Sequence, residues 1–364
     1  MTAEKQNTRA PDTRARERLP SLTGLRFVAA FLVFGFHLHV AHLLDTGAAG
    51  TVMEWVFGQG AVGVSFFFIL SGFVLTWSVR AVDTPRRFWQ RRFAKIYPNH
   101  VATWIVALLV AMVTGAGVTA AVALPNLVLV QAWFPNPDIY YGMNSPSWSL
   151  ACEALFYALF VPLYAGFIKM PARALWPATW VALALVWLVP LIAQVMPDAD
   201  DRYWFIYVFP PSRLPEFAAG MLLALVVRAG RWPHVNAGAV GVFAVVTYLV
   251  SRLLPEDIHY VAVTAIPLAL LIAAIGAGDA EGRPSPWRAR WMIWLGETSF
   301  AFYLVHQLAV RLVVRFAGDE RSVAAELAIS LACLGVAILG SWALYRIVEV
   351  PGMRLLRPRR AVKA

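Results

Sequence analysis

The chain has 364 residues, of which 60% are hydrophobic and only 14% are charged. An average soluble domain is roughly half apolar and about a quarter charged, so this composition is too apolar for a single soluble domain. The formal net charge of +10 comes from basic residues in short stretches between apolar segments. That pattern is typical of the cytoplasmic loops of a membrane protein and argues against a nucleic-acid partner.

Residues 1–19 form a polar, basic N-terminal tail without the apolar core and small-residue cleavage site of a signal peptide. The segments that follow include ten apolar stretches long enough to cross a membrane: 22–43, 60–79, 96–114, 147–168, 175–195, 205–228, 235–254, 259–276, 290–316 and 325–348. We therefore predict one transmembrane domain over 20–350 and a basic C-terminal tail over 351–364.

An eleventh apolar segment, 118–134, is short and interrupted by proline and polar residues, and a loop rich in proline and asparagine follows it. If this segment crossed the membrane, every later basic cluster would face outward, against the positive-inside rule. We therefore predict that 118–146 is a re-entrant or surface hairpin. The predicted fold is an all-α bundle of about ten transmembrane helices in the cell membrane, with both termini cytoplasmic.

Two ionisable residues of the first span, Arg26 and His37, share one helix face, because eleven residues at about 100° each nearly complete three turns. Such groups are costly inside a span and usually line a cavity or pathway. His39 and His42 point in other directions. The alternative is that Arg26 extends to the interface and His37 is a hydrogen-bonded core residue.

The densest basic stretch, which contains Arg91, Arg92, Lys95 and Tyr97, is expected to be a loop at the start of the third span. The positive-inside rule accounts for this charge, but clustered cations would also bind a phosphorylated ligand. Arg26 would continue the charge toward the membrane interior.

The fourth span opens with Trp148 and Ser149, which are candidate substrate-binding residues, and carries Glu153 about 9 Å from its outer end. This depth is comparable to that of His37. A carboxylate beside an imidazole fixes its tautomer and raises its basicity. We therefore predict that Glu153 orients His37 as a general base; the alternative is a structural hydrogen-bond network around Glu153.

Two later spans supply further candidates for substrate binding. Arg213 and Glu216 are three residues apart, and a structural ion pair is the favoured interpretation. Ser299, Tyr303 and His306 lie on related faces of the ninth span, where they could line an acceptor pocket. His306 is the competing base.

The two cysteines, Cys152 and Cys333, fall within apolar segments and form no C-x-x-C pair, so we expect neither a disulfide nor a metal site.

Taken together, five motifs resemble the acyltransferase 3 family of integral membrane O-acyltransferases, from Leu19 to about Leu356. They are Arg26 ten residues before His37, GAVGVSFFFILSGF at 60–73, RRFAKIYP at 91–98, WSLACE at 148–153 and LGETSFAFYLVH at 295–306. The resemblance implies transfer of an acyl group from a cytoplasmic donor such as acyl-CoA to a hydroxyl of a carbohydrate or similar acceptor.

The family's motif positions correspond to Arg26, His37, Arg91, Arg92 and Glu153, with Lys95 where arginine is frequent. Lysine keeps the charge but loses the bidentate geometry of a guanidinium, which puts a phosphate contact there in doubt.

The resulting hypothesis is that His37 deprotonates the acceptor hydroxyl as it attacks the thioester, while the basic stretch and Arg26 hold acyl-CoA as a co-substrate. One alternative is a transporter or exporter of a polar or glycosylated small molecule. Another is an acyl-enzyme on Cys152 or Ser149. A polysaccharide, a cell-envelope glycan and a glycosylated secondary metabolite such as a macrolide all stay open as acceptors, as do acetyl and longer acyl groups.

Overall fold

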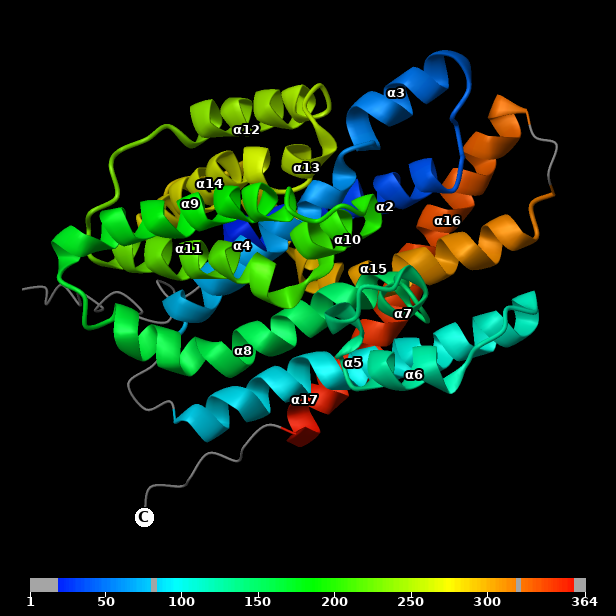
Figure 1. Cartoon of the computed structure of the whole chain (residues 1–364), viewed down its shortest axis with the longest axis horizontal. Helices are drawn as coiled ribbons and strands as arrows, with labels where there is room; N and C mark the ends of the chain where they lie inside the picture. The colour runs from blue at the N-terminus through cyan, green and yellow to red at the C-terminus, as the bar shows by residue number, and fades with distance from the viewer. Residues whose placement is uncertain (1–18, 80–83, 319–321, 357–364) are drawn as a thin grey trace, which may run out of the picture.

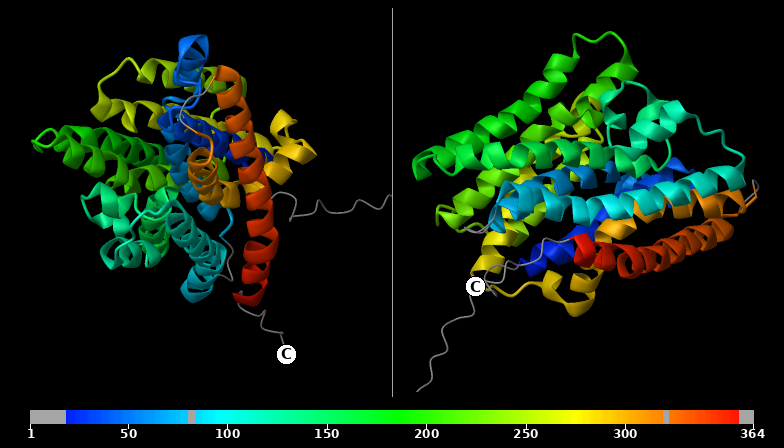
Figure 2. Two further views of the ribbon diagram at one scale, coloured as in Figure 1. Left: turned by 90° about the vertical axis from the view of Figure 1, so that its right-hand side faces the viewer. Right: turned by 90° about the horizontal axis from the view of Figure 1, so that it is seen from below.

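The computed structural model describes residues 19–79, 84–318 and 322–356, and the regular elements within these ranges are all helical. Ten of the described helices have 15 or more residues and run side by side in one elongated bundle (Figures 1 and 2). They are α2 (Pro20–Val40), α4 (Gly63–Trp77), α5 (Pro85–Thr114), α8 (Trp148–Phe167), α9 (Leu175–Ala193), α11 (Pro210–Arg228), α12 (Ala237–Ser251), α14 (Ala262–Ala280), α15 (Arg290–Arg315) and α16 (Val323–Leu344). Each corresponds to one predicted span, so the all-α membrane fold is confirmed.

Seven helical segments within the described ranges are long and apolar enough to cross a membrane. The other three long helices differ in length or charge: α12 has 15 residues, and α11 and α15 carry ionisable residues along their length. Residues 1–18 and 357–364 of the predicted tails lie outside the described residues. Within the predicted C-terminal tail, residues up to 356 belong to a short helix, α17 (Val350–Leu356).

The segment 118–146 forms no long helix, as predicted. It contains the short helices α6 (Ala120–Leu127) and α7 (Pro137–Tyr140), joined by turns. The Nε2 atom of His100 on α5 donates to the backbone oxygen of Asn126 at 2.9 Å, and Asn126 Nδ2 donates to Ser147 Oγ at 2.8 Å. The hairpin is therefore fastened to α5 and to the start of α8, so protein groups satisfy its irregular backbone.

Two helical segments extend beyond the predicted spans. The basic stretch before the third span is a helix and not the expected loop. Helix α5 begins at Pro85 and continues through Pro98, whose ring faces Gly352 of α17. Another helix, α3 (Gly47–Phe57), occupies the predicted loop after the first span. It is attached to α12 by an ion pair between Glu54 and Arg252.

Two glycines allow the close helix contacts that position the interior polar residues. A Cβ on Gly72 of α4 would lie 2.0 Å from the backbone oxygen of Phe217 on α11, and one on Gly296 of α15 would lie 1.9 Å from that of Thr23 on α2. Small residues let helix backbones approach closely in a membrane. The second contact brings α2 and α15 together, and these helices carry His37 and His306.

Successive long helices alternate in direction, which sorts the charged loops (Figure 1). The loops at one end, here called the basic end, carry Lys169, Arg173, Arg231, Arg283 and Arg288. The loops and short helices at the opposite end, the far end, carry Asp45, Glu54, Asp198 and Asp257, and the two arginines among them, Arg202 and Arg252, pair with Asp257 and Glu54. Helices α2, α5 and α15 run from the basic end to the far end, and α8 runs the opposite way.

Candidate active site

A polar cavity of about 150 Å³ lies among α2, α4, α5, α8 and α15. Its ionisable and hydroxyl-bearing lining residues are Arg26, Ser71, Arg92, Lys95, Ser149, Glu153, Tyr157 and Tyr303. Aromatic side chains, including Phe67, Phe68 and Phe300, form much of the remaining wall. The fold thus gathers six of the predicted site residues from four helices around one space inside the bundle.

Of the cations that line this cavity, Arg26 is the most available to bind a ligand. Within the described residues it makes no hydrogen bond or ion pair, and the charges of Glu349 and Glu153 act on it from nearby. Lys95, in contrast, is paired with Glu349. Arg92 stands over the ring of Phe88, with its guanidinium carbon 5.9 Å from the ring centre.

Glu349, which sequence reasoning missed, does not line the cavity but holds the lining residue Lys95 in place. Its carboxylate is fully buried and accepts hydrogen bonds from Lys95 Nζ and, at 2.6 Å, from Asn99 Nδ2. It ends a π-helix, η7 (Tyr345–Glu349), and such bulges are frequent at functional sites. A lone carboxylate at the end of the last apolar span was the available signal.

The predicted contact between Glu153 and His37 is wrong. Glu153 Oε2 accepts a hydrogen bond from Tyr157 at 2.8 Å, and the charges acting on Glu153 are those of cavity cations, led by Arg26. Glu153 follows Ser149 by one turn toward the basic end, whereas His37 lies toward the far end of its helix. The estimate of depth from the start of the span placed the two side chains too close together.

The partner of His37 is instead His306. His37 Nδ1 lies 2.8 Å from the backbone oxygen of Val33 and 3.1 Å from His306 Nε2, and His306 Nδ1 lies 3.3 Å from the backbone oxygen of Phe302. Because a carbonyl oxygen only accepts, both Nδ1 atoms carry the proton in the neutral rings. His306 Nε2 then accepts from His37, which leaves His37 Nε2 with a lone pair for proton transfer.

Tyr303 connects the histidine pair to the cavity. Its hydroxyl lies 2.9 Å from Ser149 Oγ and donates to the backbone oxygen of Pro146 at 3.1 Å, and its ring centre lies 5.8 Å from that of His306. Ser149 and Tyr303 therefore belong to the cavity wall. Trp148 is buried behind it, against Phe68.

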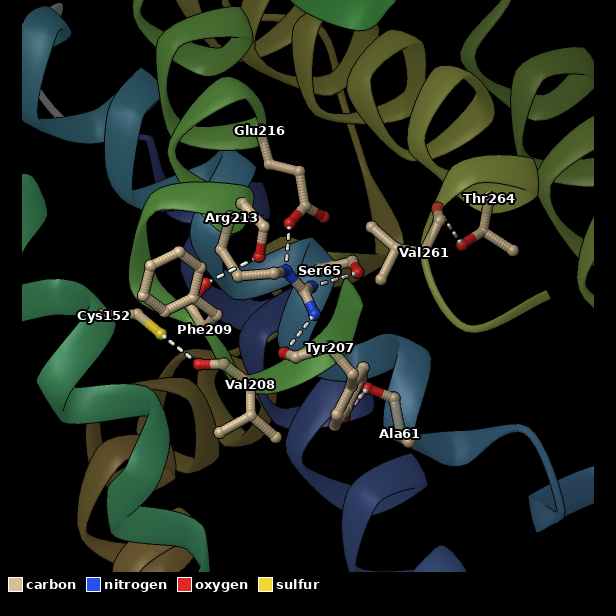
Figure 3. A network of polar contacts seen from close by, with 11 residues as sticks. Ala61, Ser65, Cys152, Tyr207, Val208, Phe209, Arg213, Glu216, Val261 and Thr264 are labelled. Carbon is tan, nitrogen blue, oxygen red and sulfur yellow. Dashed lines mark hydrogen bonds and ion pairs between the residues drawn. The ribbon is translucent and has the colours of Figure 1, made fainter. Parts of the chain in front are cut away.

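The Arg213 guanidinium is bonded entirely to protein groups, as Figure 3 shows. It donates to Glu216 Oε2 at 2.7 Å, to the backbone oxygen of Tyr207 at 2.8 Å and to Ser65 Oγ at 2.9 Å. Arg213 and Glu216 are fully buried and do not line the cavity. This geometry favours the structural interpretation of the pair over a role in substrate binding.

Four other candidates also lie away from the cavity lining. Ser299 is buried and donates to the backbone oxygen of Gly296 at 2.7 Å. Tyr97 stacks on Phe93, and Arg91 shares the helix with Arg92 but does not line the cavity. Cys152 is buried, with its Sγ 3.5 Å from the backbone oxygen of Val208.

The part of the chain that the structure describes offers no set of ligands for a metal ion. Within residues 19–79, 84–318 and 322–356, no group of three or more His, Cys, Asp or Glu side chains is arranged to hold a metal ion.

A helical membrane bundle that surrounds a polar cavity with cations, a carboxylate and paired imidazoles has the components of an integral membrane enzyme. A family model described as an acyltransferase domain matches residues 19–346, and the chain belongs to this acyltransferase 3 family. The protein is therefore a multi-pass membrane acyltransferase, which sets aside the transporter alternative.

Three relatives illustrate the range of the family. The chain is 38% identical to acyltransferase MdmB of Streptomyces mycarofaciens, over 95% of this chain and 94% of the relative. It is 30% identical to the exopolysaccharide production protein ExoZ of Rhizobium meliloti, over 84% and 93%. It is 24% identical to the peptidoglycan O-acetyltransferase OatA of Listeria monocytogenes, over 80% of this chain and 49% of the relative. No solved structure matches the chain.

Proposed function

We propose that the protein transfers a short acyl group, such as acetyl, from acyl-CoA to a hydroxyl of a carbohydrate or glycosylated acceptor. One observation carries the proposal: a polar cavity has cations toward the basic end and adjoins, through Tyr303, a histidine pair with a free lone pair. The relatives named for peptidoglycan O-acetylation and exopolysaccharide production support a carbohydrate acceptor.

The donor would bind from the basic end, which we propose to be cytoplasmic together with both termini. Arg26 and Arg92 would contact the CoA phosphates, because a guanidinium matches phosphate geometry with two parallel hydrogen bonds. Lys95 shares its charge with Glu349 and would contribute less. Arg91 and Tyr97, which lie outside the cavity, would contact only the outer part of the donor. Glu153 would balance the cations between donor bindings.

The chemical step would take place at His37. Its Nε2 accepts the proton of the acceptor hydroxyl as that oxygen attacks the thioester carbonyl, the bond from carbon to sulfur breaks, and the proton leaves with CoA thiol. His306 Nε2 accepts the hydrogen bond from His37 Nδ1 throughout, which stabilises the imidazolium. The acceptor would approach from the far end of the bundle, where both histidines lie.

The test is acyl transfer in membrane vesicles with radiolabelled acetyl-CoA and a glycan or glycoside acceptor pool. We expect His37→Ala to lower turnover by about 10² to 10⁴ fold, the usual contribution of a general base. His42→Ala is the matched control, because that side chain is 84% exposed and pairs with Asp45 at the surface. The comparison is made at equal amounts of extracted, monodisperse protein.

Three results would overturn parts of this proposal. If His37→Ala retains turnover and His306→Ala abolishes it, the base is His306. A labelled acyl group trapped on Ser149, which lines the cavity, would establish an acyl-enzyme route. Acyl-CoA would be excluded as the donor if the same membranes acylate the acceptor from another source while the radiolabel of acetyl-CoA is never transferred.

A further inference from the structure

A second, larger cavity of about 990 Å³ lies on the other side of α2 and α4, between these helices, α12 and α14. It shares no lining residue with the polar cavity. Its long walls are apolar and include Leu25, Leu32, Phe66, Val245, Leu249 and Leu268. The volume is that of a site for a small molecule or a chain, far above the roughly 30 Å³ of one water.

The cavity exists because α12 presents small residues to its neighbours. Gly238, Gly241 and Ala244 line it, and a Cβ added to Gly241 would meet no atom within 4 Å. Val242 and Val245 also line it and are 64% and 59% exposed. Among the described residues, no side chain covers this face of α12, although the helix lies along α14 (Figure 1).

The two ends of this cavity differ in chemistry. At the far end α3 closes it, because the Tyr248 hydroxyl donates to the backbone oxygen of Val56 at 2.7 Å and both residues belong to the lining. At the basic end the lining becomes polar, with Asp279, Arg283 and Trp287. A chain would therefore enter from the basic end.

The charges at the basic end favour an anionic ligand at Arg283. The Asp279 carboxylate already accepts from Ser21 Oγ at 2.6 Å and pairs with Arg288 at 3.3 Å. Among the described residues, the one ion-pair partner of Arg283 is Glu281, and both side chains are about half exposed. An exposed pair of this kind is weak, so a phosphate can replace Glu281 at the guanidinium. Tryptophan, here Trp287, is enriched at the level of lipid headgroups.

We propose that this cavity binds one phospholipid from the leaflet at the basic end, with an acyl chain along α12 and the headgroup phosphate at Arg283. The bilayer supplies chains of the required length, and an empty apolar space would forfeit dispersion contacts that a chain restores. The bound chain would hold α12 against α2 and α4. This site does not depend on the acyl transfer proposed above, since α2 and α4 separate the two cavities.

Native mass spectrometry of the full chain tests the proposal, with palmitoyl-oleoyl phosphatidylglycerol added back to delipidated protein in detergent. We expect one tightly held lipid per chain. Gly241→Phe places a ring in the cavity, across the path of a chain along α12, and should lower the bound fraction at least tenfold. Gly335→Phe is the matched control, because its Cβ would also meet open space but on α16, away from the cavity.

A second variant tests the proposed contact between Arg283 and the headgroup phosphate. We expect Arg283→Ala to lower the affinity for phosphatidylglycerol about tenfold, as the loss of a charge-assisted hydrogen bond does, with a smaller effect on phosphatidylcholine. Acyl transfer should be unchanged in this variant, so failure of the lipid site and failure of the proposed function are distinguishable.

Photolabelling of the unmodified protein gives an answer even if Gly241→Phe does not fold. A phospholipid with a diazirine in its chain should label residues 237–249 more than residues 323–344 of α16, which line neither of the two cavities. Equal labelling of both segments, or equal lipid retention by the two phenylalanine variants, would refute the site. A lipid-free dimer in which a second copy fills the cavity would also refute it.

Discussion

Arg213 and Arg26 are both arginines inside the bundle, yet the protein uses them in opposite ways. Arg213 donates to a carboxylate, a carbonyl and a hydroxyl at 2.7 to 2.9 Å and is completely buried (Figure 3). Arg26 makes no hydrogen bond or ion pair among the described residues and lines the polar cavity. A guanidinium whose nitrogens all donate to protein groups stabilises the fold. A guanidinium at a cavity without such partners is available to a ligand.

This contrast gives a rule for every polar residue of the interior. Substitution of a buried side chain that is hydrogen-bonded to protein groups should lower stability, because its partners are left buried without a hydrogen bond. Substitution of a cavity group should lower activity and leave the folded protein intact. Variants of the two regions test this rule.

The largest effect is expected for Arg213→Ala. Removal of one member of a buried ion pair leaves Glu216 as an uncompensated charge, which costs about 3 to 5 kcal/mol. The yield of monodisperse protein and its thermal midpoint in detergent are the measurements. Arg213→Met combined with Glu216→Leu removes both charges and should recover most of that loss. If Arg213→Ala folded normally and lost only activity, the distinction between the two arginines would fail.

Arg26→Ala should have the opposite profile. The folded protein should extract and melt as the natural chain does, while KM for acyl-CoA rises roughly 10 to 100 fold, as expected when a charge-assisted hydrogen bond to a phosphate is lost. Arg26→Lys should recover part of the affinity, because it keeps the charge without the bidentate geometry. A large drop in thermal stability would instead show that Arg26 is structural.

His306→Ala should lower kcat about tenfold with little change in KM, because His37 keeps its lone pair and the Val33 carbonyl but loses the second acceptor at Nδ1. Steady-state kinetics with acceptor and donor varied in turn would measure the split. A change confined to KM would mean that His306 binds the acceptor and does not support the base.

The smallest effect is expected for Tyr303→Phe, which tests the boundary between the two classes. Tyr303 is bonded to protein groups and also lines the cavity. Loss of a neutral hydrogen bond costs about 0.5 to 1.5 kcal/mol. The free energy of unfolding should fall by about this amount, and turnover by only a few fold. Thermal midpoint and turnover, measured on the same preparation, would reveal an effect on one alone.

The spans and the hairpin were predictable because both follow from chain-local properties. Apolar length located the ten helices, and the sign of the loop charges predicted that 118–146 does not cross, in agreement with its short helices. The helical continuation of α5 through Pro98 was not predictable in this way. It depends on packing of that ring against Gly352, more than 250 residues further along the chain.

The candidate site was predictable as a set of residues but not as a set of pairs. Helix periodicity placed Arg26 and His37 on one face, and six predicted side chains do meet around one cavity. Periodicity gives no reliable depth between antiparallel helices, so Glu153 was assigned to His37 when His306 is the partner. Arg213 and Glu216 show the same limit. The sequence pattern of an ion pair three residues apart is the same whether the pair faces a ligand or the core.

The π-helix that ends at Glu349 has a consequence for how this family can vary. A helix wound to i+5 holds one more residue per turn than an α-helix, so the loss of one residue from 345–349 can be absorbed by a return to α-helical winding, and the helices on either side keep their faces. The loss of one residue within α16 would instead rotate every later residue by about 100°, and Glu349 would turn away from Lys95 with its chemistry unaltered. The length of α16 therefore constrains the position of this carboxylate as strictly as its identity does, and a change of one residue should be tolerated in the loops and within 345–349 but not in α16.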